Sequence, residues 1–527
     1  TTIMQPAEKS EKSTEKYKLA HSETLGRYFV AAKDLTPGEV ILRESVKVVG
    51  PGAFNKNFMC FACLRILPDV NTSKRLHSCS SCNVAIFCST ACQSRKSHHT
   101  KDECDALRSN ESLSSLDKLP TIMQILLPLR IWLLQKGDEA LWNRVLSMEA
   151  HVDERRDTPI WKNREVNVIE VLRNLNLVPE ERNSEPELLQ RLCGILDVNS
   201  FELRPPGGSE DSPLRGLFPD TAIMAHECIR NTHITVDNQF LLTVYASVPI
   251  KSGETILVNY TSPLLGSDER REHLRQGKYF ECDCSRCADP KELGSNLSTI
   301  VCPRCKSGLV TNRKPLKKNV YAGSESWQCD KCQSFISGKL VRTTLVLTKN
   351  LITQTESTIE NLEDLLQKLI CSFHPNHFFV VALKQKIFEL YKKECACLNP
   401  DKTMMEKMLK TARDIVSVFD VVEPGISRSK GILLWEMHLP MVLLADRDYT
   451  DGKIGAQKLV ERLEDAESHL KRSLTMLLLE PPDTPEGFLA RQALQDFKSL
   501  RETLAQARLL NTSIKIHERA KDHRQKK

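Results

Sequence analysis

The chain has 527 residues, of which 40% are hydrophobic, and a formal net charge of +6. At about 150 residues per domain, this length predicts three or four domains with enough apolar residues for sizeable cores. The charge is too small for the length to indicate a nucleic-acid-binding surface. We find no uninterrupted apolar run that approaches the roughly 18 residues of a membrane span.

The residues 1–20 are rich in Lys, Glu and Ser and almost free of apolar side chains, which predicts disorder. Residues 25–50 alternate in short apolar runs around Thr36-Pro37-Gly38-Glu39, a pattern that predicts a β-hairpin. Residues 60–104 are dense in thiols and poor in large apolar side chains. We expect metal to supply their folding free energy, on the order of 10 kcal/mol or more.

Helices are predicted next, because residues 105–204 carry dense and periodic leucine, isoleucine and valine. After a loop that begins at Pro205-Pro206-Gly207, short apolar runs predict strands up to residue 262. From 340 to 520, amphipathic segments of about 15–25 residues alternate with turns that contain Pro or Gly. That pattern predicts antiparallel helix pairs, although no clean repeat period is present.

The 19 cysteines recur at short intervals and beside histidines, which is typical of metal sites rather than disulfides. The first group has eight ligands at zinc spacing: Cys60, Cys63, Cys79, Cys82, Cys88, Cys92, His99 and Cys104. A later group, Cys302, Cys305, Cys329 and Cys332, has the spacing of a zinc ribbon. Metal spacing, together with the lack of a recognisable secretory leader, favours the cytoplasm, the nucleus or both.

Four segments together resemble the SET and MYND domain-containing (SMYD) family of protein lysine methyltransferases, in a divergent, arthropod-type form. The family patterns are G-x-G-L-x-A with G-E, the MYND cysteines, N-S-F with G-L-Y-P and N-H-S-C-x-P-N, and G-E-E-[LI]-x3-Y with C-x-C-x2-C. Their counterparts are residues 26–39, 60–104, 199–231 and 253–287. The order and spacing of these patterns hold from about residue 25 to residue 290.

The resemblance implies an α+β multidomain fold with a β-rich SET core in two parts, residues 21–59 and 205–262. A MYND zinc module (60–104) and a helical insertion (105–204) split this core. A post-SET zinc segment (263–290), an extra zinc ribbon (300–335) and an α-helical, TPR-like C-terminal domain (340–520) follow.

Ligand sets for about four zinc ions follow from the same resemblance and the ribbon spacing. In the MYND module one set is Cys60, Cys63, Cys88 and Cys92, and the other is Cys79, Cys82, His99 and Cys104. The family pattern would place a histidine at Thr100, so His99 is chosen here and His98 stays an alternative. Cys282, Cys284 and Cys287 supply only three thiolates, and the resemblance supplies Cys228 as the fourth.

The resemblance also assigns an active site for methyl transfer from S-adenosylmethionine to a lysine amine. Tyr260 would be the catalytic tyrosine, with Phe201 and Phe280 as the walls of an aromatic channel. A dry channel lowers the pKa of the acceptor amine, which must be neutral to attack. The cofactor-binding residues would be Gly26, Arg27, Tyr28, Ala225, His226, Tyr260 and Phe280.

Three positions depart from the family pattern. Tyr28 replaces the second glycine, Ala225 replaces an asparagine, and Lys278 stands where the family has a tyrosine, although a one-residue slip would let Tyr279 substitute. Loss of one buried polar partner typically costs about 1–3 kcal/mol. An alternative function is therefore a catalytically weak or inactive adaptor in transcriptional regulation.

The leading prediction is a protein-lysine N-methyltransferase that acts on histone or non-histone proteins. Its expected partners are a lysine-containing protein substrate and proline-rich peptides at the MYND surface, with the chain itself a monomer. A sequence-specific zinc-finger DNA binder is disfavoured, because the cysteines lack the required histidine-bearing helix pattern and the charge is low.

Overall fold

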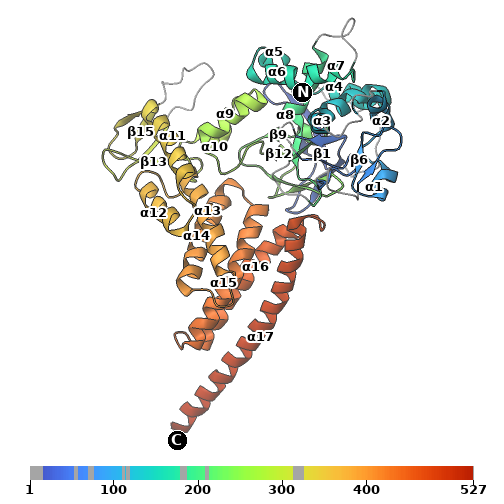
Figure 1. Cartoon of the computed structure of the whole chain (residues 1–527). Coiled ribbons are helices and arrows are strands. Elements are labelled where there is room, and N and C mark those ends of the chain that lie inside the picture. Colours follow the sequence, from blue (N-terminus) through green and yellow to red (C-terminus); the bar gives the residue numbers. More distant parts are fainter. Residues whose placement is uncertain are drawn as a thin grey trace.

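The computed structural model describes residues 16–52, 57–68, 76–109, 113, 119–178, 187–207, 213–312 and 326–525. Small β-sheets and mostly short helices make up the N-terminal half, and the C-terminal part is helical and includes the longest helices (Figure 1). The predicted α+β fold class is confirmed. Among the helices described, none combines the length and apolar character needed to cross a membrane.

The β-rich part is assembled from strands on both sides of the cysteine-rich segment. Before it come β1 (Tyr17–Ser22), β2 (Gly26–Ala31), β3 (Val40–Ser45) and β4 (Val48–Pro51). Well after it come β7 (Phe201–Leu203), β8 (Leu214–Leu217), β9 (Ala225–His226), β10 (Thr232–Val236), β11 (Leu241–Ala246) and β12 (Leu257–Val258). The sheets have the orders β1-β2, β10-β11-β3, β4-β8-β7 and β12-β9. Two of them join strands from both sides, so one β-domain is interrupted by the intervening chain.

The β-hairpin predicted for residues 25–50 is wrong. β2 pairs with β1, whereas β3 pairs with β11, and the turn at residues 36–39 connects two different sheets. Gly38 has a φ of +84°, so a turn is present where the sequence indicates one. Apolar alternation shows which face of a strand is buried, but it does not identify a partner strand that lies far along the chain.

The predicted disorder of residues 1–20 extends too far, because residues 17–20 belong to β1. Tyr17 packs against Phe29 with their ring centroids 4.6 Å apart, and the Lys16 ammonium donates to the Val40 carbonyl at 2.6 Å. Pairing with β2 satisfies the backbone of this polar segment, which its composition does not indicate. Residues 1–15 lie outside the described residues.

The cysteine-rich segment contains β5 (His77–Ser78), β6 (Ile86–Phe87), α1 (Thr90–Arg95) and α2 (Lys101–Arg108). Its large apolar side chains Phe61 and Phe87 are buried in the same hydrophobic cluster as Val48 of β4 and Leu126. The segment therefore shares the core of its neighbours.

The predicted helical insertion is present. It consists of α3 (Leu119–Gly137), α4 (Glu139–Leu146), α5 (Val152–Arg155), α6 (Pro159–Arg164), a π-helical turn (Glu165–Ile169), α7 (Glu170–Asn174) and α8 (Leu188–Asn199). α3 is buried along most of its length and packs closely on β4. A Cβ added to Gly50 would lie 2.9 Å from Leu127 Cβ, so this close approach needs glycine.

Two short helices, α9 (Ser267–Lys278) and α10 (Ser285–Ala288), follow the β-domain. Next comes an antiparallel four-stranded sheet with the order β13 (Ile300–Val301), β14 (Leu309–Asn312), β15 (Ser326–Cys329) and β16 (Phe335–Ser337). This sheet carries the cysteines of the predicted zinc ribbon.

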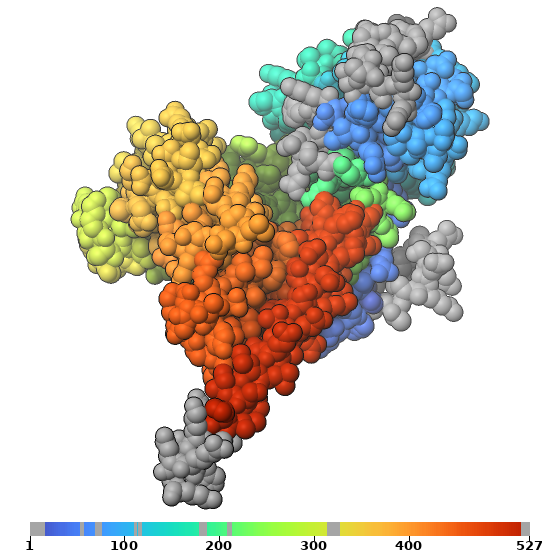
Figure 2. All heavy atoms as spheres, turned by 60° about the horizontal axis from the view of Figure 1, so that its bottom comes forward, coloured from blue at the N-terminus to red at the C-terminus, as the bar shows by residue number. Residues whose placement is uncertain are grey.

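The C-terminal part consists of helices, and from α12 onward successive helices lie side by side, while α11 contacts α13 (Figure 1). They are α11 (Gly338–Gln354), α12 (Ile359–Ile370), α13 (Phe378–Cys395), α14 (Lys402–Val422), α15 (Arg428–Thr450), α16 (Ala456–Leu477) and α17 (Pro485–Gln525). The start of α17 reaches the β-domain and its other end projects away from it (Figures 1 and 2). Among the described residues, the ion pairs Arg230–Glu423 at 2.6 Å and Arg204–Glu486 at 2.9 Å join the two parts, as does a hydrogen bond between His233 Nε2 and Glu480 at 2.9 Å.

Candidate functional site

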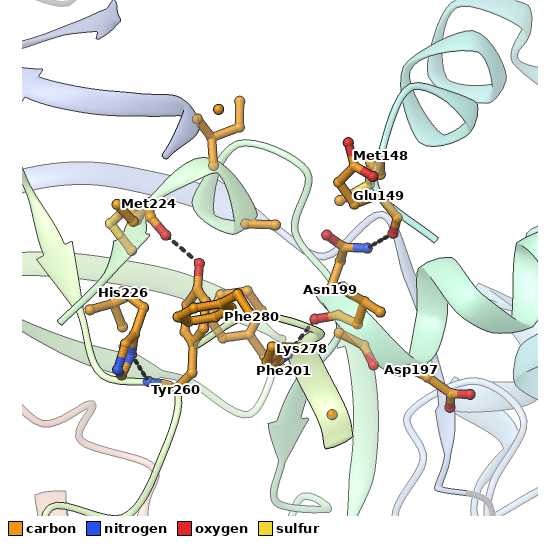
Figure 3. Close-up of a pocket in the computed structure, with 18 of the residues that line it drawn as sticks. Met148, Glu149, Asp197, Asn199, Phe201, Met224, His226, Tyr260, Lys278 and Phe280 are labelled. Carbon is orange, nitrogen blue, oxygen red and sulfur yellow. Dashed lines mark hydrogen bonds between the residues drawn. The ribbon is translucent and has the colours of Figure 1, made fainter. Parts of the chain in front are cut away.

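A cavity of about 1470 Å³ opens between the β-domain, helices α8 and α9, and the start of α15. Of the residues to which the resemblance assigns catalysis or cofactor binding, seven line it: Gly26, Arg27, Phe201, Ala225, His226, Tyr260 and Phe280. They come from segments far apart in the sequence, and the fold brings them to one place (Figure 3).

Tyr260 follows β12 and lies on the wall of this cavity. Its hydroxyl donates to the Met224 carbonyl at 2.5 Å, and its backbone N–H donates to His226 Nδ1 at 2.9 Å (Figure 3). Burial raises the pKa of the phenol to about 12, so the hydroxyl stays protonated at neutral pH. Both ends of the residue are therefore fixed, and the hydroxyl keeps its proton, which it donates to the Met224 carbonyl.

His226 connects the tyrosine to the cysteine cluster behind it. Its ring lies 5.1 Å from the Tyr260 ring and 5.8 Å from the Phe280 ring, measured between centroids. Burial lowers the pKa of the imidazole to about 4, so the ring is neutral at pH 7. Because Nδ1 accepts from Tyr260, the proton is on Nε2, which lies 3.5 Å from Cys228 Sγ.

Phe201 in β7 and Phe280 after α9 both face the cavity, as the channel interpretation requires. Phe201 is held by an edge-on contact with Phe218, with ring centroids 5.6 Å apart. Together with Tyr260 they give the cavity an aromatic wall (Figure 3).

Of the first three residues expected to bind the cofactor, Gly26 and Arg27 line the cavity and Tyr28 does not. Gly26 has a φ of +64°, and a Cβ added there would meet no atom within 4 Å, so its conformation rather than crowding favours glycine. Arg27 is held by a hydrogen bond to the Ser147 carbonyl at 2.9 Å. Tyr28 is not among the residues that line the cavity, and its φ is not positive. The tyrosine in place of glycine at position 28 therefore causes no backbone strain.

Lys278, not Tyr279, faces the cavity at the position where the family has a tyrosine. The proposed one-residue slip does not occur, because Tyr279 has a φ of +62° and turns away to stack on His151, with centroids 4.9 Å apart. The Lys278 ammonium lies 5.2 Å from the centroid of the Tyr260 ring and donates to the Val198 carbonyl. Sequence reasoning treated Lys278 only as a departure from a pattern and missed its place in the site.

A cysteine cluster packs against Tyr260 and Phe280, two residues of the cavity wall. The Cys228 thiol lies 3.5 Å from Cys287 Sγ and 3.9 Å from Cys282 Sγ, and all four sulfurs of Cys228, Cys282, Cys284 and Cys287 are within 4.8 Å of one another. Tetrahedral zinc with Zn–S bonds of about 2.3 Å separates its sulfurs by roughly 3.8 Å. The donor set fits a structural zinc ion, and it fastens the segment that carries Phe280 to the β-domain.

A buried ionic network supports this cluster. The Arg270 guanidinium lies 3.3 Å from Cys228 Sγ through Nε, and it pairs with Glu292 at 2.7 Å. Arg286 also pairs with Glu292, at 3.0 Å. Thiolates carry negative charge when they bind metal, so the nearby guanidinium of Arg270 would stabilise them.

The other three cysteine clusters are the sets expected from resemblance and spacing. Cys60, Cys63, Cys88 and Cys92 form one, Cys79, Cys82, His99 and Cys104 form another, and Cys302, Cys305, Cys329 and Cys332 form the last. His99 Nε2 lies 3.7 Å from Cys82 Sγ, and its Nδ1 hydrogen-bonds to Glu103 at 2.7 Å. His98 instead packs against Phe240, with centroids 5.7 Å apart. The four clusters fit about four zinc ions.

We expect His98→Ala to keep the full zinc content, because His98 takes no part in the cluster of Cys82 and His99. Removal of its contact with Phe240 would cost about 1–2 kcal/mol of stability at most. Metal analysis of the purified variant checks this result. Loss of one zinc ion per chain would instead make His98 the ligand.

The β-domain is split by a cysteine-rich module, and a further cysteine cluster packs against the tyrosine wall of the cavity. This is the arrangement that the SET and MYND resemblance implies. Homologues at 24–30% identity over about 50–60% of the chain are SET and MYND domain proteins. No protein-family model matches the chain.

The SET domain-containing protein SmydA-8, isoform A, of Drosophila melanogaster is 30% identical over 323 residues, which are 60% of this chain and 64% of that protein. Histone-lysine N-methyltransferase Smyd1 of Mus musculus is 25% identical over 52% of this chain and 56% of its own length. The chain thus spans less than two thirds of these two relatives. The solved SET domain of LSMT, bound to lysine and AdoHcy, is 11% identical over 94% of this chain and 89% of that one, at a TM-score of 0.29, too low for any inference.

Proposed function

We propose that the chain is a protein-lysine N-methyltransferase that uses S-adenosylmethionine and acts on histone or non-histone proteins. The observation that carries the proposal is the convergence of Cys228 with the distant trio Cys282, Cys284 and Cys287. This clamp holds Phe280 beside Tyr260 on a cavity that Gly26 and Ala225 also line.

The residues that would hold the cofactor are Gly26, Arg27, Ala225 and His226, with Tyr260 and Phe280 beside the reacting end. S-adenosylmethionine would supply an electrophilic methyl group on a sulfonium. Tyr28, which the resemblance placed in this set, does not line the cavity and is left out. The open space around Gly26 and the polar groups of the cavity are compatible with a ligand of this size.

The residues of the chain would act by orientation and exclusion of water. The Tyr260 hydroxyl and the Met224 carbonyl form a fixed hydrogen-bonded pair at the wall of the cavity. Such dipoles orient a reacting amine without having to reorganise. Phe201 and Phe280 exclude water, and a poorly solvated amine loses its proton more readily.

We expect Tyr260→Phe to reduce methyl transfer by on the order of 100-fold or more, because removal of one preorganised donor costs that much in other sites. Calorimetric titration with S-adenosylmethionine, followed by measurement of methyl incorporation into core histones and cell-extract proteins, tests the proposal. Binding by wild type and Tyr260→Phe alike, with transfer only by wild type, is the expected result. No binding to wild type at millimolar cofactor would leave only the adaptor.

The adaptor is kept as a second candidate because of two residues. Ala225 lies in the cavity without the amide side chain of the family asparagine, and Lys278 puts an ammonium where the family has a phenol. In that case the zinc module would bind proline-rich peptides and the C-terminal helices would bind a partner. Those partners, a monomeric state and a cytoplasmic or nuclear location stay predictions.

A further inference from the structure

The charge around Lys278 is the feature of the cavity that the resemblance does not account for. Lys278 is the last residue of α9, and its ammonium is fixed by the Val198 carbonyl and by the face of the Tyr260 ring. Burial and the nearby Arg215 lower the pKa of this amine to about 8, and Asp197 opposes the shift. Lys278 is therefore mostly charged at pH 7 and mostly neutral at pH 9.

Neighbouring groups do not cancel this charge. Asp197 of α8 is already paired with Arg155 at 2.7 Å and with Arg164 Nε at 3.1 Å, so two cations share one carboxylate. Arg215 of β8 lines the same cavity. The cavity is also lined by Tyr260 and His226, which are neutral at pH 7, by His273, and by the carboxylates Glu149 and Glu202. The charged groups that act on the pKa of Lys278 are Arg215 and Asp197.

We propose that Lys278 is a specificity-determining residue that selects against positive charge at the reacting end of the cavity. The inference rests on the proposed function and deepens it. A sulfonium and a protonated acceptor amine would both meet the ammonium of Lys278, whereas a neutral thioether and a neutral amine would not. The site would therefore take its acceptor nitrogen only in the unprotonated form. It would also bind the demethylated cofactor more tightly than the methylated one.

The test compares the binding of S-adenosylmethionine and S-adenosylhomocysteine, which differ in the methyl group and the charge on sulfur. Wild type, Lys278→Met and Lys278→Arg are titrated calorimetrically at pH 7 and pH 9. Methionine keeps the length of the side chain without its charge, and arginine keeps the charge at both pH values. Comparison of the three proteins at one pH cancels the titration of the ligands themselves.

At pH 7 we expect wild type and Lys278→Arg to prefer S-adenosylhomocysteine over S-adenosylmethionine by roughly tenfold more than Lys278→Met does, the order expected for two nearby charges in a partly buried site. At pH 9 the wild-type ratio should approach that of Lys278→Met, while Lys278→Arg keeps its ratio.

Equal ratios for the three proteins at pH 7 would overturn the inference and leave the proposed function standing. So would a wild-type ratio that does not approach the Lys278→Met ratio at pH 9. Failure of all three folded proteins to bind either ligand would contradict both the inference and the proposed function. Zinc content and thermal unfolding establish that each variant is folded, and Lys278→Arg provides a reading even if Lys278→Met is unstable.

Discussion

Cys228→Ser should lose about one of the four zinc ions, because a closed structural site needs four ligands and Cys282, Cys284 and Cys287 supply only three. Structural zinc contributes apparent binding free energies of about 10–16 kcal/mol, so the post-SET segment should unfold locally. Phe280 and Lys278 would then leave the wall of the cavity. We expect binding of S-adenosylmethionine to weaken by on the order of 100-fold or to vanish, measured by metal analysis and calorimetry.

Cys371→Ser is the matched control for this variant. Cys371 is exposed and belongs to none of the four clusters found in the described residues. Its replacement should leave zinc content unchanged and stability within about 0.5 kcal/mol of wild type. If Cys228→Ser kept all its zinc and its cofactor binding, the clamp would not be what shapes the cavity.

The metal ligands could be predicted from the sequence because their chemistry is local. Pairs such as Cys60 with Cys63 and Cys302 with Cys305 have the spacing of one chelating turn, and few other functions need that spacing. The fourth ligand of the post-SET trio could not be found in this way. Cys228 stands alone in the sequence, and only the resemblance indicated that it meets the trio.

The errors occur where long-range contacts decide the structure. β3 has the turn and the alternation of a hairpin arm, but its edge is paired with β11, and nothing within residues 25–50 indicates this. Tyr17–Ser22 is polar enough to suggest disorder, but it forms a strand because its backbone pairs with β2. At residues 278–279 a single left-handed residue, Tyr279, decides which side chain enters the cavity. A pattern match does not resolve that choice.

Arg130→Met should lower the free energy of unfolding by about 3–5 kcal/mol, the usual cost of leaving a buried charge without its partner. Arg130 Nε donates to Glu103 at 2.6 Å, and its other nitrogens donate to the carbonyls of Val49 at 2.8 Å and Phe61 at 2.9 Å. Burial alone would raise the pKa of the Glu103 carboxyl, but the charge of Arg130 and the hydrogen bonds from His99 and Arg130 together outweigh it and hold that pKa below its ordinary value. One guanidinium thus joins α3, β4 and the zinc module.

The same variant should also weaken zinc binding in the module by roughly 10- to 100-fold, because Glu103 orients the ligand His99. Denaturant unfolding and competition with a chelator measure the two effects. Arg108→Ala is the control, since the pair of Arg108 with Asp105 is exposed and worth about 0–1 kcal/mol. Adding Glu103→Gln to Arg130→Met should restore part of the lost stability, because it removes the stranded charge. If Arg130→Met were as stable as wild type, the module would dock on the β-domain through apolar contacts alone.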